Sequence, residues 1–190
     1  QIEIKAAIEN LIDTFLYAGK ISIELRKKGL IKEIKEDNTP VSNGDLEVNR
    51  ILTEKINNLT PQIPIVSEET SHNKSKKDLK NFWLIDPIDG TYDYINDLDE
   101  FTLNAGLIIN NRAVAGIIYA PAKNRLFYSY GKGCSFEIIN NKHVKLDCSK
   151  TSNNKLRFVS YSNKLKPEIN KIYQTMNVSE FKRMKSSLKF

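Results

Sequence analysis

The chain has 190 residues, of which 40% are hydrophobic and 27% charged, and its formal net charge is +6 at pH 7. That length is enough for one hydrophobic core, or for one domain plus part of another, and the composition is that of a globular protein. No apolar run approaches the ~20 residues of a membrane span, and the lysines form no aromatic-interleaved basic stripe, so neither a membrane protein nor a partner of nucleic acid polymers is indicated.

The start of the chain and its cysteines bear on the cellular compartment. Residues 1–5 have neither the basic end nor the apolar stretch of a signal peptide. Cys134 and Cys148 lack metal-ligand spacing and are expected to be reduced thiols. We therefore expect a cytoplasmic protein.

The first sixty residues predict two helices. Apolar residues recur at three- and four-residue steps from Ile4 to Leu25, which predicts an amphipathic helix over residues 1–28 that ends at Gly29. Residues 31–41 are polar and predict an extended loop or a short hairpin. Residues 42–45 have helix-start chemistry. The apolar stripe of the second helix comprises Val48, Ile51, Leu52 and Ile56.

From Ile63 onward the pattern changes to short strands. Two apolar runs, 63–66 and 82–85, each end in acidic residues. Residues 102–109 and 112–119 flank Asn110-Asn111, which predicts a hairpin turn. An antiparallel meander continues over residues 126–130, 135–139 and 143–146. Helices followed by this meander predict an α+β fold, with two helices on an antiparallel sheet.

A polar segment over residues 148–154 predicts a linker and a domain boundary. Beyond it, residues 156–160 predict a strand and residues 167–176 a helix with Pro167 in its first turn. We expect residues 1–150 to form an N-terminal α+β metal-binding domain. Residues 151–190 are expected to begin a C-terminal α/β domain that is truncated.

The acidic residues that follow the two apolar runs predict a cation site. Glu68 and Glu69 follow the first run, and Asp86 and Asp89 belong to the Asp-Pro-Ile-Asp-Gly-Thr segment, residues 86–91. Two like charges about 4 Å apart repel by about 4 kcal/mol at an effective dielectric constant near 20. Oxygen ligands favour Mg²⁺, Mn²⁺ or Ca²⁺ over zinc. Taken alone, the segment leaves open that Asp86 and Asp89 merely cap a turn and a helix.

The residues between and after the two aspartates suit the same site. Pro87 disfavours the helical region for Asp86, and the Ile88 carbonyl can point toward the ion as a neutral ligand. Gly90 lets a phosphate approach the backbone. Thr91 begins a short helix, whose free N–H groups favour an anion.

These segments resemble the lithium-sensitive inositol monophosphatase superfamily, which implies a layered α/β/α/β/α fold. Residues 37–45, 67–70, 119–122 and 186–190 are most similar to its 3'(2'),5'-bisphosphate nucleotidase branch. The resemblance implies an Mg²⁺-dependent phosphoric monoester hydrolase that removes the 3'-phosphate of adenosine 3',5'-bisphosphate, a by-product of sulfate assimilation. The alternatives are an inositol-1-monophosphatase, a sugar bisphosphate phosphatase, or a non-catalytic metal- or nucleotide-binding fragment.

The resemblance also implies roles for individual residues. Glu68, Asp86 and the Ile88 carbonyl hold the first Mg²⁺, and Asp86 and Asp89 hold a second. The Gly90 and Thr91 amides bind phosphate oxygens. Asp45 hydrogen-bonds Thr91, and these two residues together with Glu68 activate the attacking water, so Asp45, Glu68 and Thr91 are the expected catalytic residues.

Two departures from the family pattern limit these expectations. Family members continue past residue 190, and the further part holds a Trp-Asp motif whose aspartate completes the second metal site. Lys185 stands where a glycine often precedes Ser186. We therefore expect an incomplete chain with weak or no activity toward a small phosphorylated substrate. A homodimer is left open.

Overall fold

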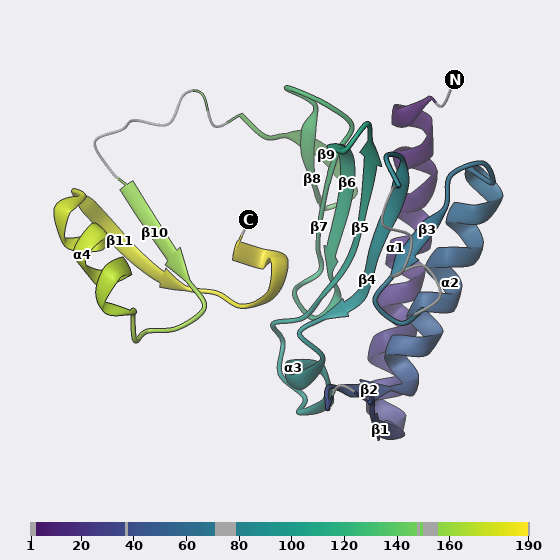
Figure 1. Cartoon of the computed structure of the whole chain (residues 1–190), viewed down its shortest axis with the longest axis horizontal. Coiled ribbons are helices and arrows are strands. Elements are labelled where there is room, and N and C mark those ends of the chain that lie inside the picture. The colour runs from purple at the N-terminus through teal and green to yellow at the C-terminus, as the bar shows by residue number, and fades with distance from the viewer. Residues whose placement is uncertain (1–2, 37, 71–78, 148, 150–155, 190) are drawn as a thin grey trace.

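The computed structural model describes residues 3–36, 38–70, 79–147, 149 and 156–189. Two long helices, α1 (Ile4–Lys28) and α2 (Asn43–Leu59), cover one face of a seven-stranded sheet (Figure 1). Strands β1 (Lys32–Ile34) and β2 (Pro40–Ser42) pair as a hairpin between them. Both predicted helices are therefore present. Within the described residues, no helix has the length and apolar character needed to cross a membrane.

The sheet has the strand order β3-β4-β5-β6-β7-β8-β9. Its strands are β3 (Ile65–Ser67), β4 (Phe82–Asp89), β5 (Thr102–Ile109), β6 (Arg112–Ala120), β7 (Arg125–Ser129), β8 (Ser135–Ile139) and β9 (Lys142–Lys145). The consecutive strands from β4 to β9 pair antiparallel, as predicted. Strands β3 and β4 pair in parallel, so the sheet is mixed rather than purely antiparallel. The connection over residues 68–81 is long enough for the crossover that parallel strands require.

The core lies between the two helices and the sheet. Ile8, Leu11 and Phe15 of α1 are fully buried, as are Leu103 and Leu107 of β5. Each such side chain stabilises the fold by roughly 1.5–3 kcal/mol relative to an exposed one. Helix α2 packs against β3 and β4, which carry the acidic residues, and α1 packs against β6.

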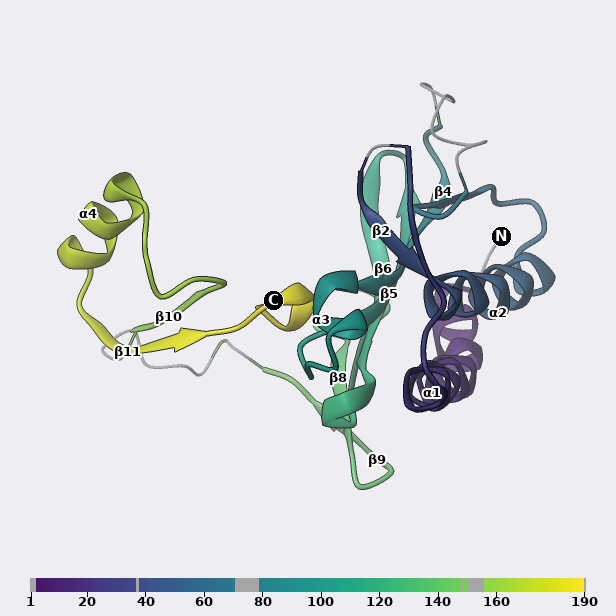
Figure 2. The same cartoon turned by 90° about the horizontal axis from the view of Figure 1, so that it is seen from below.

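The C-terminal residues form a separate unit on the other side of the sheet (Figure 2). Strands β10 (Leu156–Ser160) and β11 (Val178–Arg183) pair in parallel, and helix α4 (Pro167–Thr175) connects them. The short helix η3 (Ser186–Lys189) returns to the sheet. The sequence predicted β10 and α4, but not β11 or η3. Most of the predicted linker, 148 and 150–154, lies outside the described residues.

Candidate metal and phosphate site

Parallel pairing of β3 and β4 brings two acidic strand ends to one edge of the sheet. Ser67 pairs with Ile85, and the Glu68 N–H donates to the Ile85 carbonyl at 3.1 Å. Glu68, which follows β3, and Asp86, which lies within β4, are therefore at the same level. The sequence predicted that these two strands deliver carboxylates to one site, and their parallel register brings the two residues to the same level.

A bulge in β4 places Asp86 and Asp89 on one face of the sheet. Residues three apart in a regular strand point to opposite faces, because the side-chain period is two. Here Asp86 pairs with Asn104 and Asp89 with Thr102, so two residues of β4 oppose one residue of β5. Such a bulge adds one residue to the strand and shifts the alternation. The bulge thereby converts a spacing of three residues into a pair of carboxylates on the same face.

The Asp86 carboxyl group lies in an environment that disfavours its charge. Burial raises its pKa to about 8, with further increases from the nearby charges of Glu68 and Asp89. Its Oδ1 is buried and has no hydrogen-bond partner among the described residues, and the same is true of Thr102 Oγ1 and Asn104 Oδ1. Buried oxygens without partners call for an explanation such as a bound ion. These oxygens and the adjacent carboxylates suit a hard divalent cation.

The acidic side chains among the described residues do not meet at a single point. Within the described part of the chain, no three His, Cys, Asp or Glu side chains lie close enough to hold a metal ion together. The first expected ligand set needs only the two carboxylates of Glu68 and Asp86 with the Ile88 carbonyl. That carbonyl accepts a hydrogen bond from Thr91 Oγ1 at 3.1 Å, so it lies beside the expected water-orienting hydroxyl.

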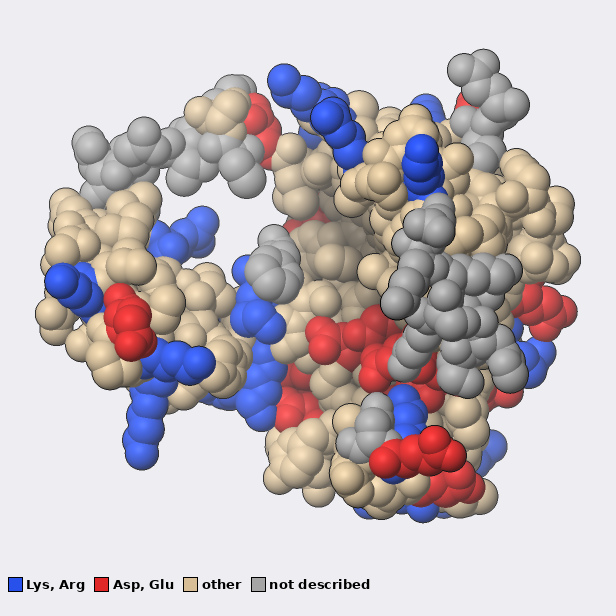
Figure 3. Space-filling model, in the orientation of Figure 1, with Lys and Arg blue, Asp and Glu red and all other residues tan. Residues whose placement is uncertain are grey.

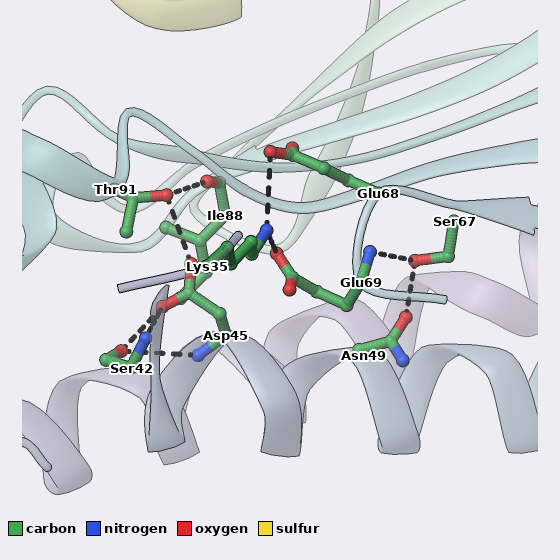
Figure 4. A network of polar contacts seen from close by, with 9 residues as sticks. All are labelled: Lys35, Ser42, Asp45, Asn49, Ser67, Glu68, Glu69, Ile88 and Thr91. Carbon is green, nitrogen blue, oxygen red and sulfur yellow. Dashed lines mark hydrogen bonds and ion pairs between the residues drawn. The ribbon is translucent and has the colours of Figure 1, made fainter. Parts of the chain in front are cut away.

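Asp45 is buried at the start of α2 and faces Thr91 (Figure 4). Its Oδ2 accepts from the Ser42 N–H at 2.8 Å and the Ser42 hydroxyl at 2.6 Å, which forms a capping box. Its Oδ1 accepts from Thr91 Oγ1 at 3.1 Å, the hydrogen bond that the resemblance implied. Burial raises the pKa of Asp45, and the bonds from Ser42 and Thr91 lower it in part.

The structure gives a second reason for a glycine at position 90, besides the approach of a phosphate that the sequence suggested. It adopts φ 93° at the N-cap of α3 (Thr91–Ile95), a conformation that favours glycine. A Cβ at this position would lie 2.4 Å from Ser186 Oγ and 3.0 Å from the Glu100 carbonyl oxygen. The glycine therefore lets η3 approach the Asp-Gly-Thr turn.

Contacts from the C-terminal turn reach the same segment. Ser186 Oγ lies 3.0 Å from the Asp89 carbonyl oxygen, and Ser187 Oγ donates to Asp89 Oδ2 at 3.1 Å. Lys185 forms a 2.9 Å ion pair with the buried Asp93. These contacts could not be predicted from the sequence, because nothing in the local pattern connects residues more than ninety positions apart. Asp89 is thus held in place by two serines of the C-terminal helix η3.

Lys35 is the other site residue that sequence analysis missed. It follows β1, and its Nζ lies 2.8 Å from Glu69 Oε1 and 3.8 Å from Glu68 Oε1 (Figure 4). Burial lowers its pKa, but the hydrogen bond and charge of Glu69 and the charges of Glu68 and Asp45 outweigh that effect and raise it. The Glu69 side chain is buried in this ion pair.

A cavity of about 770 Å³ adjoins the acidic edge, between the sheet and the C-terminal unit. Asp86 and Asn104 line it from the sheet, and Arg157, Lys182 and Ser187 line it from the other side. Figure 3 shows acidic side chains gathered beside the hollow between these two parts of the molecule. The lining of the cavity thus contains both acidic and basic side chains.

Comparisons with known proteins agree with this geometry. A family model described as the inositol monophosphatase family matches residues 4–189. The 3'(2'),5'-bisphosphate nucleotidase CysQ of Aggregatibacter actinomycetemcomitans is 35% identical over 141 residues, which cover 73% of this chain and 52% of that protein. CysQ of Haemophilus influenzae is 40% identical over 114 residues, which cover 59% of this chain and 42% of that protein. The chain spans about half the length of these curated relatives.

A solved structure supports the fold assignment. The crystal structure of CysQ from Bacteroides thetaiotaomicron, described as a bacterial member of the inositol monophosphatase family, superposes with a TM-score of 0.71 at 22% identity. The superposition covers 97% of this chain and 74% of that chain. The mixed α+β architecture described above is therefore the one found in that structure.

Proposed function

Because this chain belongs to the inositol monophosphatase family, we propose that it forms the first metal site and the water-orienting residues of an Mg²⁺-dependent phosphomonoesterase. We propose adenosine 3',5'-bisphosphate as the substrate, with its 3'-phosphate as the group removed. The two relatives named 3'(2'),5'-bisphosphate nucleotidase, at 35% and 40% identity, support this choice. The observation that carries the proposal is the bulge in β4, which brings Asp86 and Asp89 onto one face beside Glu68.

The residues that would hold the first Mg²⁺ are Glu68, Asp86 and the Ile88 carbonyl, and a second ion would use Asp86 and Asp89. Such ions polarise the phosphoryl group and neutralise the charge that develops on it. The buried, unpartnered Oδ1 of Asp86 fits this role. Ser187 supports the second position, because its hydroxyl holds Asp89 Oδ2.

The residues that would act on the attacking water are Asp45, Thr91 and Glu68. Asp45 fixes the Thr91 side chain through the 3.1 Å hydrogen bond. The raised pKa of Asp45 makes it a better proton acceptor than a solvated aspartate. The Gly90 and Thr91 amides would bind the phosphate oxygens at the start of α3, so that the water attacks in line with the leaving oxygen.

We also propose that the chain consists of an N-terminal metal-binding domain, residues 1–150, and the start of a second domain, residues 151–190. The packing supports this division, since α1 and α2 pack on the seven-stranded sheet while β10 and β11 form a sheet of their own. Among the described residues, Asp86 and Asp89 would hold the second ion. We expect Mg²⁺ to bind at the first position.

The test measures binding and turnover separately. Calorimetry with Mg²⁺ on the 190-residue chain and on Asp86→Asn should show binding that the substitution removes. Phosphate release should be measured with adenosine 3',5'-bisphosphate, inositol-1-phosphate and a sugar bisphosphate, on the chain and on a chimera that adds the remaining C-terminal part of the Haemophilus influenzae relative.

The outcomes distinguish the candidate functions. Faster turnover of adenosine 3',5'-bisphosphate by the chimera, lost on Asp86→Asn, is the expected result. Preference for either of the other substrates would assign the enzyme to another branch. Mg²⁺ binding without turnover in both proteins would indicate a non-catalytic metal-binding protein, and an Asp86→Asn chain that still binds Mg²⁺ normally would contradict the proposed site.

A further inference from the structure

The adjacent residues Glu68 and Glu69 differ in exposure and in their distance from Lys35. Its ammonium group lies 2.8 Å from Glu69 but 3.8 Å from Glu68. The Glu69 side chain is 5% exposed, whereas the Glu68 side chain is 45% exposed. Figure 4 shows the Lys35 ammonium group between the two carboxylates, with an ion pair drawn to each. The contact with Glu69 is the shorter one, and the Glu69 side chain is the more buried of the two.

The backbone holds Lys35 in this position. The Lys35 N–H donates to the Thr39 carbonyl, and the Asn38 N–H donates to the Lys35 carbonyl, both at 2.9 Å. Asn38 adopts φ 64°, a left-handed conformation that asparagine tolerates at the tip of a hairpin. The tip of the β1–β2 hairpin is therefore closed by its own hydrogen bonds, which aim the lysine at the acidic edge of the sheet.

Glu69 is also fixed from its backbone side. Its N–H donates to Ser67 Oγ at 3.3 Å, and that hydroxyl donates to the buried Asn49 Oδ1 at 2.6 Å. Breaking a buried ion pair by removing one partner leaves the other charge uncompensated. Glu69 is thus held at both ends, while Glu68 keeps only the longer, 3.8 Å contact with Lys35 and lies close enough to Asp86 to raise its pKa.

We propose that Lys35 is a positioning residue that commits Glu69 to an ion pair and so leaves Glu68 as the member of the pair that ligates the divalent ion. This inference rests on the proposed function, because it presupposes a metal at Glu68 and Asp86. Lys35 touches neither the ion nor the substrate in this role. It determines which of two chemically identical neighbours becomes the ligand.

The first measurement needs only the wild-type chain. Carboxyl ¹³C NMR during a MgCl₂ titration should show the Glu68 carboxyl carbon shifting while that of Glu69 stays in place. A Glu69 signal that moves together with that of Glu68 would overturn the assignment of Lys35. Absence of any Mg²⁺-dependent shift would overturn the proposed metal site and this inference together.

The second measurement is a double-mutant cycle read as Mg²⁺ affinity by calorimetry. In the wild-type background we expect Glu68→Gln to weaken Mg²⁺ binding about 30-fold or more, the effect of losing one ligand or a residue that orients it. Glu69→Gln should change the Mg²⁺ affinity by less than about 3-fold. In a Lys35→Met background Glu69 is released, so Glu68→Gln should then cost less than about 5-fold, because Glu69 can replace the missing ligand.

Two matched variants control for loss of a lysine in general. Lys35→Arg keeps the cation and should preserve the full effect of Glu68→Gln. Lys20→Met removes a lysine from an exposed pair with Glu24 on α1 and should leave Mg²⁺ affinity unchanged. If Glu68→Gln weakens Mg²⁺ binding by the same factor with and without Lys35, the lysine does not determine which glutamate is the ligand. If Lys35→Met does not fold, the NMR titration of the wild-type chain decides alone.

Discussion

Replacement of Asp86 by asparagine should change the stability of this protein in opposite directions with and without Mg²⁺. Asparagine has nearly the same shape as aspartate but carries no charge and cannot be deprotonated. In the metal-free protein the substitution removes a carboxylate that the site disfavours. In the presence of Mg²⁺ it removes a proposed ligand. A residue retained only for packing would not reverse the sign of its effect in this way.

The magnitude follows from the raised pKa of Asp86. Burial raises this pKa from 3.8 to about 8, with added contributions from Glu68 and Asp89. The folded protein therefore binds a proton more tightly than the unfolded chain does. The resulting stability is fully present below about pH 4 and is lost as the pH rises through about 8. About four pKa units at about 1.4 kcal/mol each give a loss on the order of 5 kcal/mol, an upper limit because neighbouring carboxylates share the proton.

The assay is urea unfolding of both proteins at about pH 5 and about pH 9, in EDTA and in MgCl₂. In EDTA the wild-type protein should lose several kcal/mol of unfolding free energy between the two pH values, and Asp86→Asn should lose much less. Mg²⁺ should restore the wild-type protein at alkaline pH by mass action and leave Asp86→Asn unchanged. Asp13→Asn on the exposed side of α1 is the matched control and should follow the wild type.

Two results would refute this reasoning. Equal pH dependence of wild type and Asp86→Asn in EDTA would mean that Asp86 is not the group that titrates. Equal stabilisation of both proteins by Mg²⁺ would mean that the ion binds elsewhere. Either result alone removes Asp86 from the centre of the site.

Three further substitutions test the surrounding contacts by urea unfolding at neutral pH. Thr91→Val removes the donor to the buried Asp45 Oδ1, so the unfolding free energy should fall by about 1–3 kcal/mol and the pKa of Asp45, followed by carboxyl NMR, should rise further; an unmoved pKa would contradict the contact. Gly90→Ala should cost about 2 kcal/mol or more, because φ is 93° and the new Cβ meets Ser186 Oγ at 2.4 Å; a cost below about 0.5 kcal/mol would show that η3 does not pack there. Ser187→Ala should cost about 1 kcal/mol through the lost bond to Asp89, and unchanged stability would argue against that bond.

The sequence predicted the elements whose causes are local. The apolar stripe that starts at Ile4 and the helix start at Ser42 gave both long helices, because side-chain periodicity and capping act within a few residues. The turn at Asn110-Asn111 was predicted for the same reason. Both asparagines have positive φ, 51° and 60°, which is the backbone that a two-residue hairpin turn requires.

The features that escaped prediction depend on contacts between distant segments. The parallel pairing of β3 with β4 follows from a long connection rather than from a turn signal. Strand β11 has no alternation of buried and exposed residues, since its burial pattern does not repeat with a period of two. Lys35 lies at the tip of the β1–β2 hairpin, where the sequence shows only polar residues, and it bonds to Glu69, 34 residues further along the chain. Candidate ligands could be read from the sequence, but the residues that orient them could not.

The structure also bears on two interpretations that the Asp-Pro-Ile-Asp-Gly-Thr segment left open. If Asp86 and Asp89 were only caps, their carboxylates would accept hydrogen bonds from backbone N–H groups at the start of α3. Instead Gly90 is the N-cap of that helix, without a side-chain bond. Asp86 Oδ1 has no partner among the described residues, and Asp89 Oδ2 accepts from Ser187.

The same segment concentrates features that destabilise the fold. It carries a raised pKa at Asp86, a bulge, and a left-handed turn at Gly90, whereas the strands and helices around it pack regularly. Local conflicts of this kind persist where a site needs them. A bound divalent cation would neutralise the carboxylates and use the orphaned Asp86 oxygen, whereas a capping role would explain neither the raised pKa nor that oxygen.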